Sequence, residues 1–189
     1  MPSLLAILRD ILLLRRGPQD LPYSPALLTM AALAGLLVSQ MAGVLLLPTQ
    51  QDLFVRVAAA LGLGLGLLYL LLHVLQRQAR FVQTATASLF VDLVFTAITL
   101  PLLPLIEPAL RVAAKQNSTP DDMAAVMNGG VAAAVLLFVV IGIWRILVDV
   151  HVLRQALEIR PFAAFLIYFA MFFASNIMLG ALFGVAEGT

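Results

Sequence analysis

Four ionisable side chains stand in or beside long apolar runs of this sequence, and they are its best candidates for chemistry. Asp92, Arg145 and Asp149 interrupt such runs, and His73 lies near the end of another. A charge at this depth in an apolar, membrane-spanning segment is costly, so it usually faces the protein interior and is paired. Such a group forms part of a proton or ion path, a polar pocket for a lipid headgroup, or a buried ion cluster that fixes helix packing.

Five apolar segments carry these groups, and each has about the 20 residues that a helix needs to cross a hydrocarbon core. They do not alternate in polarity as barrel strands would. The chain is 62% hydrophobic and 11% charged, whereas soluble domains have about 25% charged residues. We therefore predict an all-α integral membrane helical bundle, with one five-helix membrane domain over residues 26–189. The predicted transmembrane helices are Ala26–Leu47, Leu53–Leu75, Ala87–Ile106, Gly130–Leu153 and Phe162–Gly184.

Residues 1–25 are predicted to form a separate N-terminal region. The apolar run from Leu4 to Leu14 is interrupted by Arg9 and Asp10 and is too short to cross a membrane. It is typical of an interfacial helix that lies on the membrane surface. A linker rich in proline follows, because three prolines in nine residues exclude a continuous helix. The alternative is a loosely ordered N-terminal tail.

Basic residues collect in alternate connections of the five-span topology. If the N-terminus is cytoplasmic, seven basic residues lie inside and two lie outside, as the positive-inside rule favours. We expect a multi-pass protein of the bacterial inner membrane with a cytoplasmic N-terminus and a periplasmic C-terminus. Near the cytoplasmic surface, basic side chains would meet anionic headgroups. The predicted cytoplasmic basic face consists of Arg15, Arg16, Arg77, Arg80, Arg154 and Arg160.

The predicted topology places three of the intramembrane charges at similar depths. Asp92 lies about six residues from the cytoplasmic start of the third span, and Arg145 about nine from the cytoplasmic end of the fourth. At about 1.5 Å per residue, their levels differ by only a few ångströms. Asp149 follows Arg145 by one helical turn, and His73 has nearly the depth of Asp149. We predict an intramembrane charge cluster of these four residues, which serves either structure or transport.

Small residues at intervals of four predict a closely packed helix face in the second span. Ala58, Gly62 and Gly66 have this spacing, which lets two helix backbones approach each other. The partner helix belongs either to the same chain or to a second copy in a homo-oligomer.

The ends of the third and fourth spans carry helix-breaking and helix-starting signals. Pro101, Pro104 and Pro108 predict a break or kink at the outer end of the third span. Thr119 is a good N-cap for a helix that begins at Pro120. We expect this helix to run into the fourth span through Gly129 and the glycine after it, which would weaken it there.

Two similar segments end the second and fourth spans. Residues 73–79 read HVLQRQA and residues 151–156 read HVLRQA. A duplicated helical hairpin would produce this echo, with His73 and His151 in equivalent positions. The alternative is that both cytoplasmic helix ends acquired the same interfacial residue types independently.

Signatures of catalysis are absent from the sequence. It has no HExxH, G-x-S-x-G or P-loop motif, and it has no cysteine to bind metal or act as a nucleophile. We expect a protein that is not an enzyme and has no catalytic residue, no metal and no cofactor. The net charge of +1 gives no reason to expect nucleic acid as a partner.

The layout of an N-terminal segment followed by five closely spaced helices resembles the Yip1-like membrane proteins. The segments Arg15–Pro22 and Arg80–Thr84 look characteristic of a family, and the resemblance implies a helical membrane bundle but no particular activity. We expect a non-enzymatic scaffold or accessory protein that binds membrane lipids or a partner protein through its helices and basic face. The alternative is a small transporter or channel that uses Asp92, Arg145 and Asp149. A cavity reaching these three residues would favour transport, and a dry, fully paired cluster would favour the scaffold.

Overall fold

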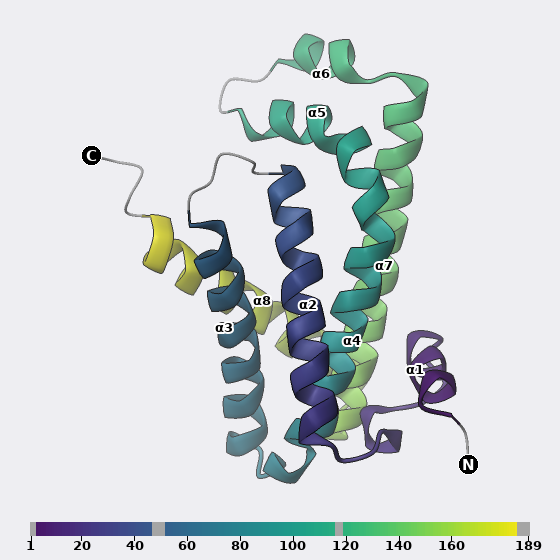
Figure 1. Cartoon of the computed structure of the whole chain (residues 1–189), viewed down its shortest axis with the longest axis vertical. Coiled ribbons are helices and arrows are strands. Elements are labelled where there is room, and N and C mark those ends of the chain that lie inside the picture. The colour runs from purple at the N-terminus through teal and green to yellow at the C-terminus, as the bar shows by residue number, and fades with distance from the viewer. Residues whose placement is uncertain (1–2, 47–51, 116–118, 185–189) are drawn as a thin grey trace.

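The computed structural model describes residues 3–46, 52–115 and 119–184, and all regular secondary structure in these ranges is helical (Figure 1). Short 3₁₀ turns at Pro18–Asp20, Gln78–Arg80 and Leu100–Leu102 connect some of the helices. In chain order the α-helices are α1 (Leu4–Leu12), α2 (Pro25–Leu46), α3 (Leu53–Val74), α4 (Phe81–Thr99), α5 (Leu103–Ala114), α6 (Pro120–Val126), α7 (Gly129–Leu157) and α8 (Pro161–Phe183).

Five of these helical segments are long and apolar enough to cross a membrane, which confirms the predicted five-span bundle. They are α2, α3, α4 with its continuation into α5, α7 and α8. In Figure 1, α5 and α6 lie across the upper end of the bundle, and the α3–α4 connection lies at the lower end. The α7–α8 connection lies at the same lower end, because Glu158 pairs with Arg77 and Arg80 of the α3–α4 connection. We call the lower end the basic end, because it carries Arg77, Arg80, Arg154 and Arg160. Its assignment to the cytoplasm stays a prediction.

The five spans form a closed ring in an order that differs from their order in the chain. Around the ring, α2 packs against α4, α4 against α7, α7 against α8, α8 against α3, and α3 against α2. Large apolar side chains such as Leu37, Leu136 and Phe173 point outward and are about half exposed or more. This pattern suits a bundle surrounded by lipid, because lipid tails solvate such side chains as well as a protein core does.

The third span breaks at Pro101, as predicted, whereas Pro108 lies inside α5 and does not end that helix. Helix α4 ends at Thr99, one 3₁₀ turn contains Pro101, and α5 begins at Leu103 and turns across the end of the bundle (Figure 1). Proline has no backbone N–H to donate and its ring clashes with the preceding turn, so a straight continuation of α4 would be strained.

The helix predicted to start at Pro120 does so, but it is separate from the fourth span. The Thr119 side chain accepts a hydrogen bond from the Asp122 N–H, and the Thr119 N–H and hydroxyl donate to the Asp122 carboxylate. The hydrogen bonds that the Thr119 N–H and hydroxyl donate to the carboxylate hold the pKa of Asp122 below its ordinary value. A second cap then starts α7, because the Asn128 side-chain oxygen accepts hydrogen bonds from the N–H groups of Gly130 and Val131. The two glycines therefore begin a helix, and the prediction that they weaken its middle is wrong.

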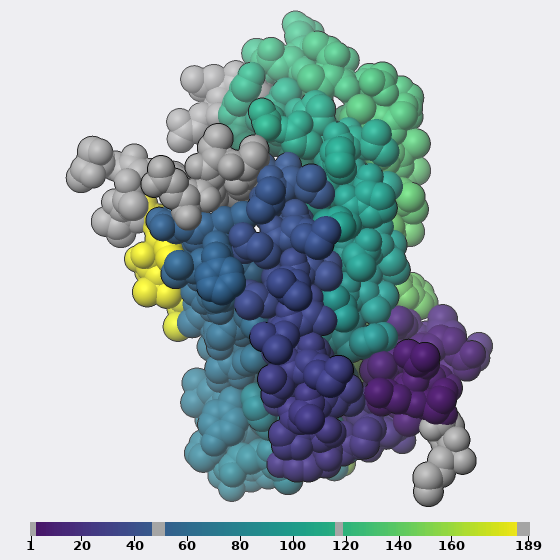
Figure 2. Space-filling model, in the orientation of Figure 1, coloured from purple at the N-terminus to yellow at the C-terminus, as the bar shows by residue number. Residues whose placement is uncertain are grey.

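The N-terminal segment, residues 3–21, packs on the flank of α4 and α7. Helix α1 buries Ile7, Leu8 and Ile11 against side chains that include Val91 and Phe95 of α4. Val91 lies ten residues into α4, about 15 Å from the basic end. Figure 2 shows this segment as a lobe on the side of the bundle away from α3. The loosely ordered tail is excluded for residues 3–21, and the place of α1 at a membrane surface stays a prediction.

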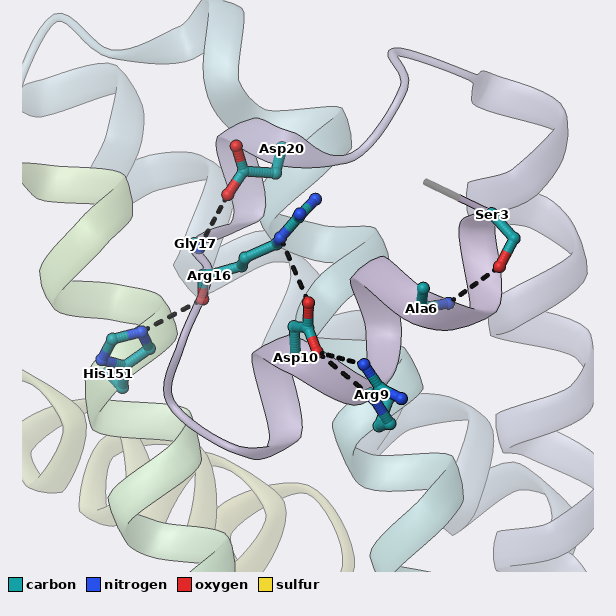
Figure 3. Close-up of polar contacts among 8 residues, drawn as sticks. All are labelled: Ser3, Ala6, Arg9, Asp10, Arg16, Gly17, Asp20 and His151. Carbon is teal, nitrogen blue, oxygen red and sulfur yellow. Dashed lines mark hydrogen bonds and ion pairs between the residues drawn. The ribbon is translucent and has the colours of Figure 1, made fainter. Parts of the chain in front are cut away.

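Polar contacts fix both the shape of this segment and its position (Figure 3). Within it, the Asp10 carboxylate accepts from Arg9 at 2.9 Å and pairs with Arg16 at 3.3 Å. Side chains of α4 and α7 reach the carbonyls that the segment leaves free. His151 Nε2 lies 3.1 Å from the Arg16 carbonyl oxygen, Trp144 Nε1 donates to the Leu12 carbonyl, and Gln83 Nε2 donates to the Leu21 carbonyl.

Candidate functional site

A cavity of about 460 Å³ lies inside the ring and is lined by residues of all five spans. Its volume falls in the range of about 300–1,000 Å³ that is typical of small-molecule sites. Leucine, valine, alanine, methionine and phenylalanine side chains form most of its wall. The polar groups that line it come from four helices: Ser39 of α2, Ser88 and Asp92 of α4, Arg145 and Asp149 of α7, and Tyr168 and Ser175 of α8.

Two glycines help to keep this space open. Gly35 of α2 and Gly64 of α3 both line the cavity, and a Cβ atom added to either would meet no atom within 4 Å. A side chain at either position would therefore project into the empty volume and reduce it.

The structure brings Asp92, Arg145 and Asp149 together at the wall of this cavity. Arg145 Nη2 donates to Asp92 Oδ1, and Arg145 Nε lies 3.8 Å from Asp149 Oδ2. Asp92 is 11 residues from the start of α4 and Arg145 is 12 residues from the end of α7. These helix lengths place both about 16–18 Å from the basic end, close to the middle of a hydrocarbon core about 30 Å thick.

The cluster is only partly buried, and its two carboxyl groups outnumber its single cation. The Arg145 and Asp92 side chains are 39% and 32% exposed, and that of Asp149 is 15% exposed. Arg145 forms the direct hydrogen bond with Asp92, so Asp149 has the weaker contact with this single cation. Two carboxylates facing one guanidinium carry a formal charge of −1, and the Tyr168 hydroxyl lies beside Asp149.

His73 does not belong to the cluster, so that part of the prediction is wrong. It is exposed at the end of α3 and stacks on Tyr69, with ring centroids 6.0 Å apart. The cavity face of α3 includes Leu61, Leu65 and Leu68. Five residues beyond Leu68 correspond to about 140° of further rotation around the helix, which turns His73 away from the cavity. His73 is also only one residue from the end of α3, whereas Asp149 is eight residues from the end of α7, so the predicted match in depth is wrong as well.

The two histidine segments also differ in their surroundings. Helix α3 ends at Val74, and both Val74 and Leu75 are exposed, at 66% and 42%. In the segment that begins at His151, α7 continues to Leu157, and the matching residues Val152 and Leu153 are buried, at 1% and 6% exposure. Because equivalent positions lie on unrelated helix faces, the echo does not mark a structural repeat.

The small-residue face of α3 has no partner helix in the described chain. Gly62 and Gly66 are exposed, and an added Cβ at either would meet nothing within 4 Å. Ala58 is half-buried. The prediction of close packing within one chain is therefore wrong for these glycines, and packing against a second copy stays a prediction.

The predicted basic face divides into paired and exposed residues. Glu158, which ends α7, pairs with both Arg77 and Arg80. Arg80 also donates to two carbonyls in the last turn of α7, which ties the α3–α4 connection to that helix. Hydrogen bonds from Arg80 and Arg77 lower the pKa of Glu158. Arg16 pairs with Asp10, whereas the remaining three, Arg15, Arg154 and Arg160, are exposed.

A further contact closes the ring at the opposite end. Arg56 near the start of α3 donates to the Phe183 carbonyl at the end of α8, and its guanidinium lies 5.1 Å from the Phe183 ring centroid. A cation at a helix C-terminus interacts favourably with the free carbonyls there. This contact joins the first turn of α3 to the last residue of α8, its neighbour in the ring.

Sequence reasoning missed several groups that face the cavity, namely Gly35, Gly64, Tyr168, Ser39 and Ser88. A usable signal existed, because Ser39, Ser88 and Ser175 lie in the interior of three different spans. A hydroxyl in an apolar helix often forms a helix–helix contact or lines a polar space. What the sequence lacks is the rotation of each helix, which decides between these two roles.

Comparison with known proteins finds no matching family model, no matching curated protein and no matching solved structure. The resemblance to the Yip1-like proteins thus has no support beyond the number and spacing of the helices. Helix length and hydropathy identify a multi-pass helical membrane protein.

Proposed function

We propose that this protein is a small membrane transporter that binds its solute in the cavity inside the five-helix ring. The observation that carries this proposal is that Asp92, Arg145 and Asp149 line an open volume of about 460 Å³. An ion cluster that only fixed helix packing would need no adjoining space, and packed interiors contain few voids larger than a water molecule.

The position of the cavity supports the same proposal. Solute sites of transporters commonly lie near the middle of the bilayer, where groups on several helices replace the water that a solute gives up. Here the charged groups lie near that level, and hydroxyls come from α2, α4 and α8. A solute would thus contact several spans at once, and its binding would favour one relative arrangement of them.

The scaffold or accessory role stays a prediction, and its support is the exposed arginines of the basic end. The two proposed roles differ in one measurable respect. In a scaffold, water should not reach the cluster of Asp92, Arg145 and Asp149, whereas in a transporter it should. The absence of cysteine from the chain allows single cysteines to measure this access directly.

Ser175 and Asn176 provide a matched pair of positions for the test. Ser175 lines the cavity, whereas Asn176 is exposed on the outer surface of α8 and donates to the Phe172 carbonyl of its own helix. The two residues have the same depth in the membrane. We expect water-soluble methanethiosulfonate reagents to modify Ser175→Cys and to leave Asn176→Cys unmodified in membranes.

A second pair of variants tests whether the reagent enters through the cavity. Gly64→Leu fills the empty volume, and Gly62→Leu places the same side chain on the outer surface two residues away. When Gly64→Leu is added to the Ser175→Cys protein, the rate of thiol modification should fall at least about tenfold. When Gly62→Leu is added instead, this rate should stay unchanged. If Ser175→Cys reacts no faster than Asn176→Cys, the cavity is dry and the transporter proposal fails.

A further inference from the structure

The cavity has features that select among classes of solute, and this selection rests on the proposed function. With both carboxyl groups ionised its formal charge is −1, because a single cation, Arg145, faces the two of them. The charged groups that face Asp149 are Arg145 on its own helix and Asp92 on α4, and α8 contributes the Tyr168 hydroxyl. From α2 and α3 only apolar residues and Ser39 line the cavity. A cationic solute would therefore neutralise the site, and an anionic one would add to its excess charge.

Asp149 is the carboxylate available for such a cation. Arg145 donates a hydrogen bond to Asp92, whereas its closest approach to Asp149 is 3.8 Å, which is beyond hydrogen-bond distance. The aromatic rings of Tyr168 and Phe172 line the same cavity. Aromatic faces attract organic cations, and a carboxylate next to them supplies the countercharge.

A metal ion fits this cavity poorly. Among the described residues, no group of three or more His, Asp or Glu side chains could hold a metal. A hard cation needs six or more oxygen ligands at short distances, but most of the cavity wall is apolar. The volume of about 460 Å³ also far exceeds what a single ion occupies, whereas an apolar body with a charged head would use both the wall and the carboxylate.

We propose that the cavity binds organic cations, namely protonated amines with an apolar body, with the ammonium group at Asp149 and the apolar part against the leucine and aromatic wall. In this arrangement Arg145 holds Asp92 in place, and Asp149 supplies the charge that the solute neutralises.

The test uses the full chain carrying Ser175→Cys in liposomes and two thiol reagents of similar size and opposite charge. One is the trimethylammonium-ethyl and the other the sulfonato-ethyl methanethiosulfonate, and each rate is normalised to the rate with 2-mercaptoethanol. We expect the cationic reagent to react at least about tenfold faster, which corresponds to about 1.4 kcal/mol. Asp149→Asn should abolish this ratio, and Asp149→Glu should retain it.

Protection experiments test the apolar body of the solute. Phenethylammonium should slow modification of Ser175→Cys at concentrations where ethylammonium and 3-phenylpropionate have no effect, and Asp149→Asn should remove this protection. Equal normalised rates for the two reagents, or equal protection by 3-phenylpropionate, would overturn the proposed selectivity while leaving a water-filled cavity and the transporter intact. If neither reagent reacts, both proposals fail together.

Discussion

Replacing Arg145 by leucine is the most direct test of the ion cluster. The change leaves Asp92 without its hydrogen-bonded cation and Asp149 without its neighbour at 3.8 Å. The formal charge of the site goes from −1 to −2 near the middle of the membrane. Asp92→Asn does the opposite, because it leaves Arg145 facing Asp149 in a neutral site. We therefore expect a large loss of stability from the first change and a small one from the second.

The size of the loss follows from the environment of the pair. Two charges about 4 Å apart attract each other by about 4 kcal/mol in a protein environment and by about 1 kcal/mol in water. Arg145 and Asp92 are 39% and 32% exposed, so the value lies between these limits, at about 3 kcal/mol. Removing one partner of a fully buried pair typically costs about 3–5 kcal/mol. At about 2–4 °C per kcal/mol for a chain of this size, Arg145→Leu should lower the melting temperature by about 6–12 °C.

Thermal unfolding of the purified protein in detergent, followed by the loss of monodisperse protein, measures this difference. Arg154→Leu is the matched control, since Arg154 is exposed near the end of the same helix and surface substitutions usually change stability by less than about 0.5 kcal/mol. Combining Arg145→Leu with Asp92→Asn should recover part of the loss, because one carboxylate is then removed. If Arg145→Leu melts at the same temperature as the parent, the cluster contributes nothing to the fold and our account of it is incorrect.

Four further predictions concern other parts of the chain. The folded protein lowers the pKa of the Glu158 carboxylate below the unfolded value of about 4.3. The ionised carboxylate therefore stabilises the fold above that unfolded pKa, and this stabilisation is lost as the pH falls through the lower folded pKa. Glu158→Gln should melt below the parent at pH 7, and the difference should vanish in strongly acidic buffer. Gly62→Ala should be neutral or slightly stabilising, since its Cβ has free space and alanine favours a helix by up to about 1 kcal/mol; a clear destabilisation would show that this face is packed after all. Trp144→Phe removes the hydrogen bond to the N-terminal segment, worth about 1 kcal/mol, and should speed amide hydrogen exchange in α1 while exchange in α8 stays the same. A single cysteine at Gln78 should react with impermeant reagents only from the cytoplasmic side, and labelling from the periplasm would invert the predicted orientation.

The number and type of the spans could be predicted from the sequence because lipid leaves few alternatives. Every backbone polar group in the hydrocarbon core must be paired within the protein, so an apolar run of about 20 residues becomes a helix almost regardless of its other preferences. The contact between Asp92 and Arg145 could be predicted for the same reason. Once the spans are known to be helices, the topology and the rise per residue determine how deep each side chain lies in the membrane. The proline break after Thr99 and the cap at Thr119 depend on local backbone geometry, which neighbouring residues determine.

Rotation about each helix axis could not be predicted, and most of the errors come from it. In a soluble protein the apolar face of a helix points inward, but here both faces are apolar, so the pattern does not distinguish them. Gly62 and Gly64 are chemically identical and two residues apart, yet one faces outward and the other lines the cavity. His73 was placed on the wrong side of α3 for the same reason, and its depth was misjudged because α7 continues to Leu157 whereas α3 ends at Val74. The docking of α1 was also missed, because it depends on where α4 and α7 leave a face free.

The order of the helices around the ring determines when its parts can meet as the chain is synthesised. Asp92 enters the membrane before Arg145 exists, because its partner lies 53 residues later in the sequence. At about 5–20 residues per second, the carboxylate waits about 3–10 s for its counterion. During this interval a lone aspartate at the centre of a helix raises the free energy of membrane insertion by about 2.5–3.5 kcal/mol. Helix α4 is therefore the span that gains most by staying next to the insertion machinery instead of moving into lipid. The wall of the cavity is completed only by α8, the fifth of the five spans in chain order, and a nascent chain that stops before α8 exposes its charged interior to lipid.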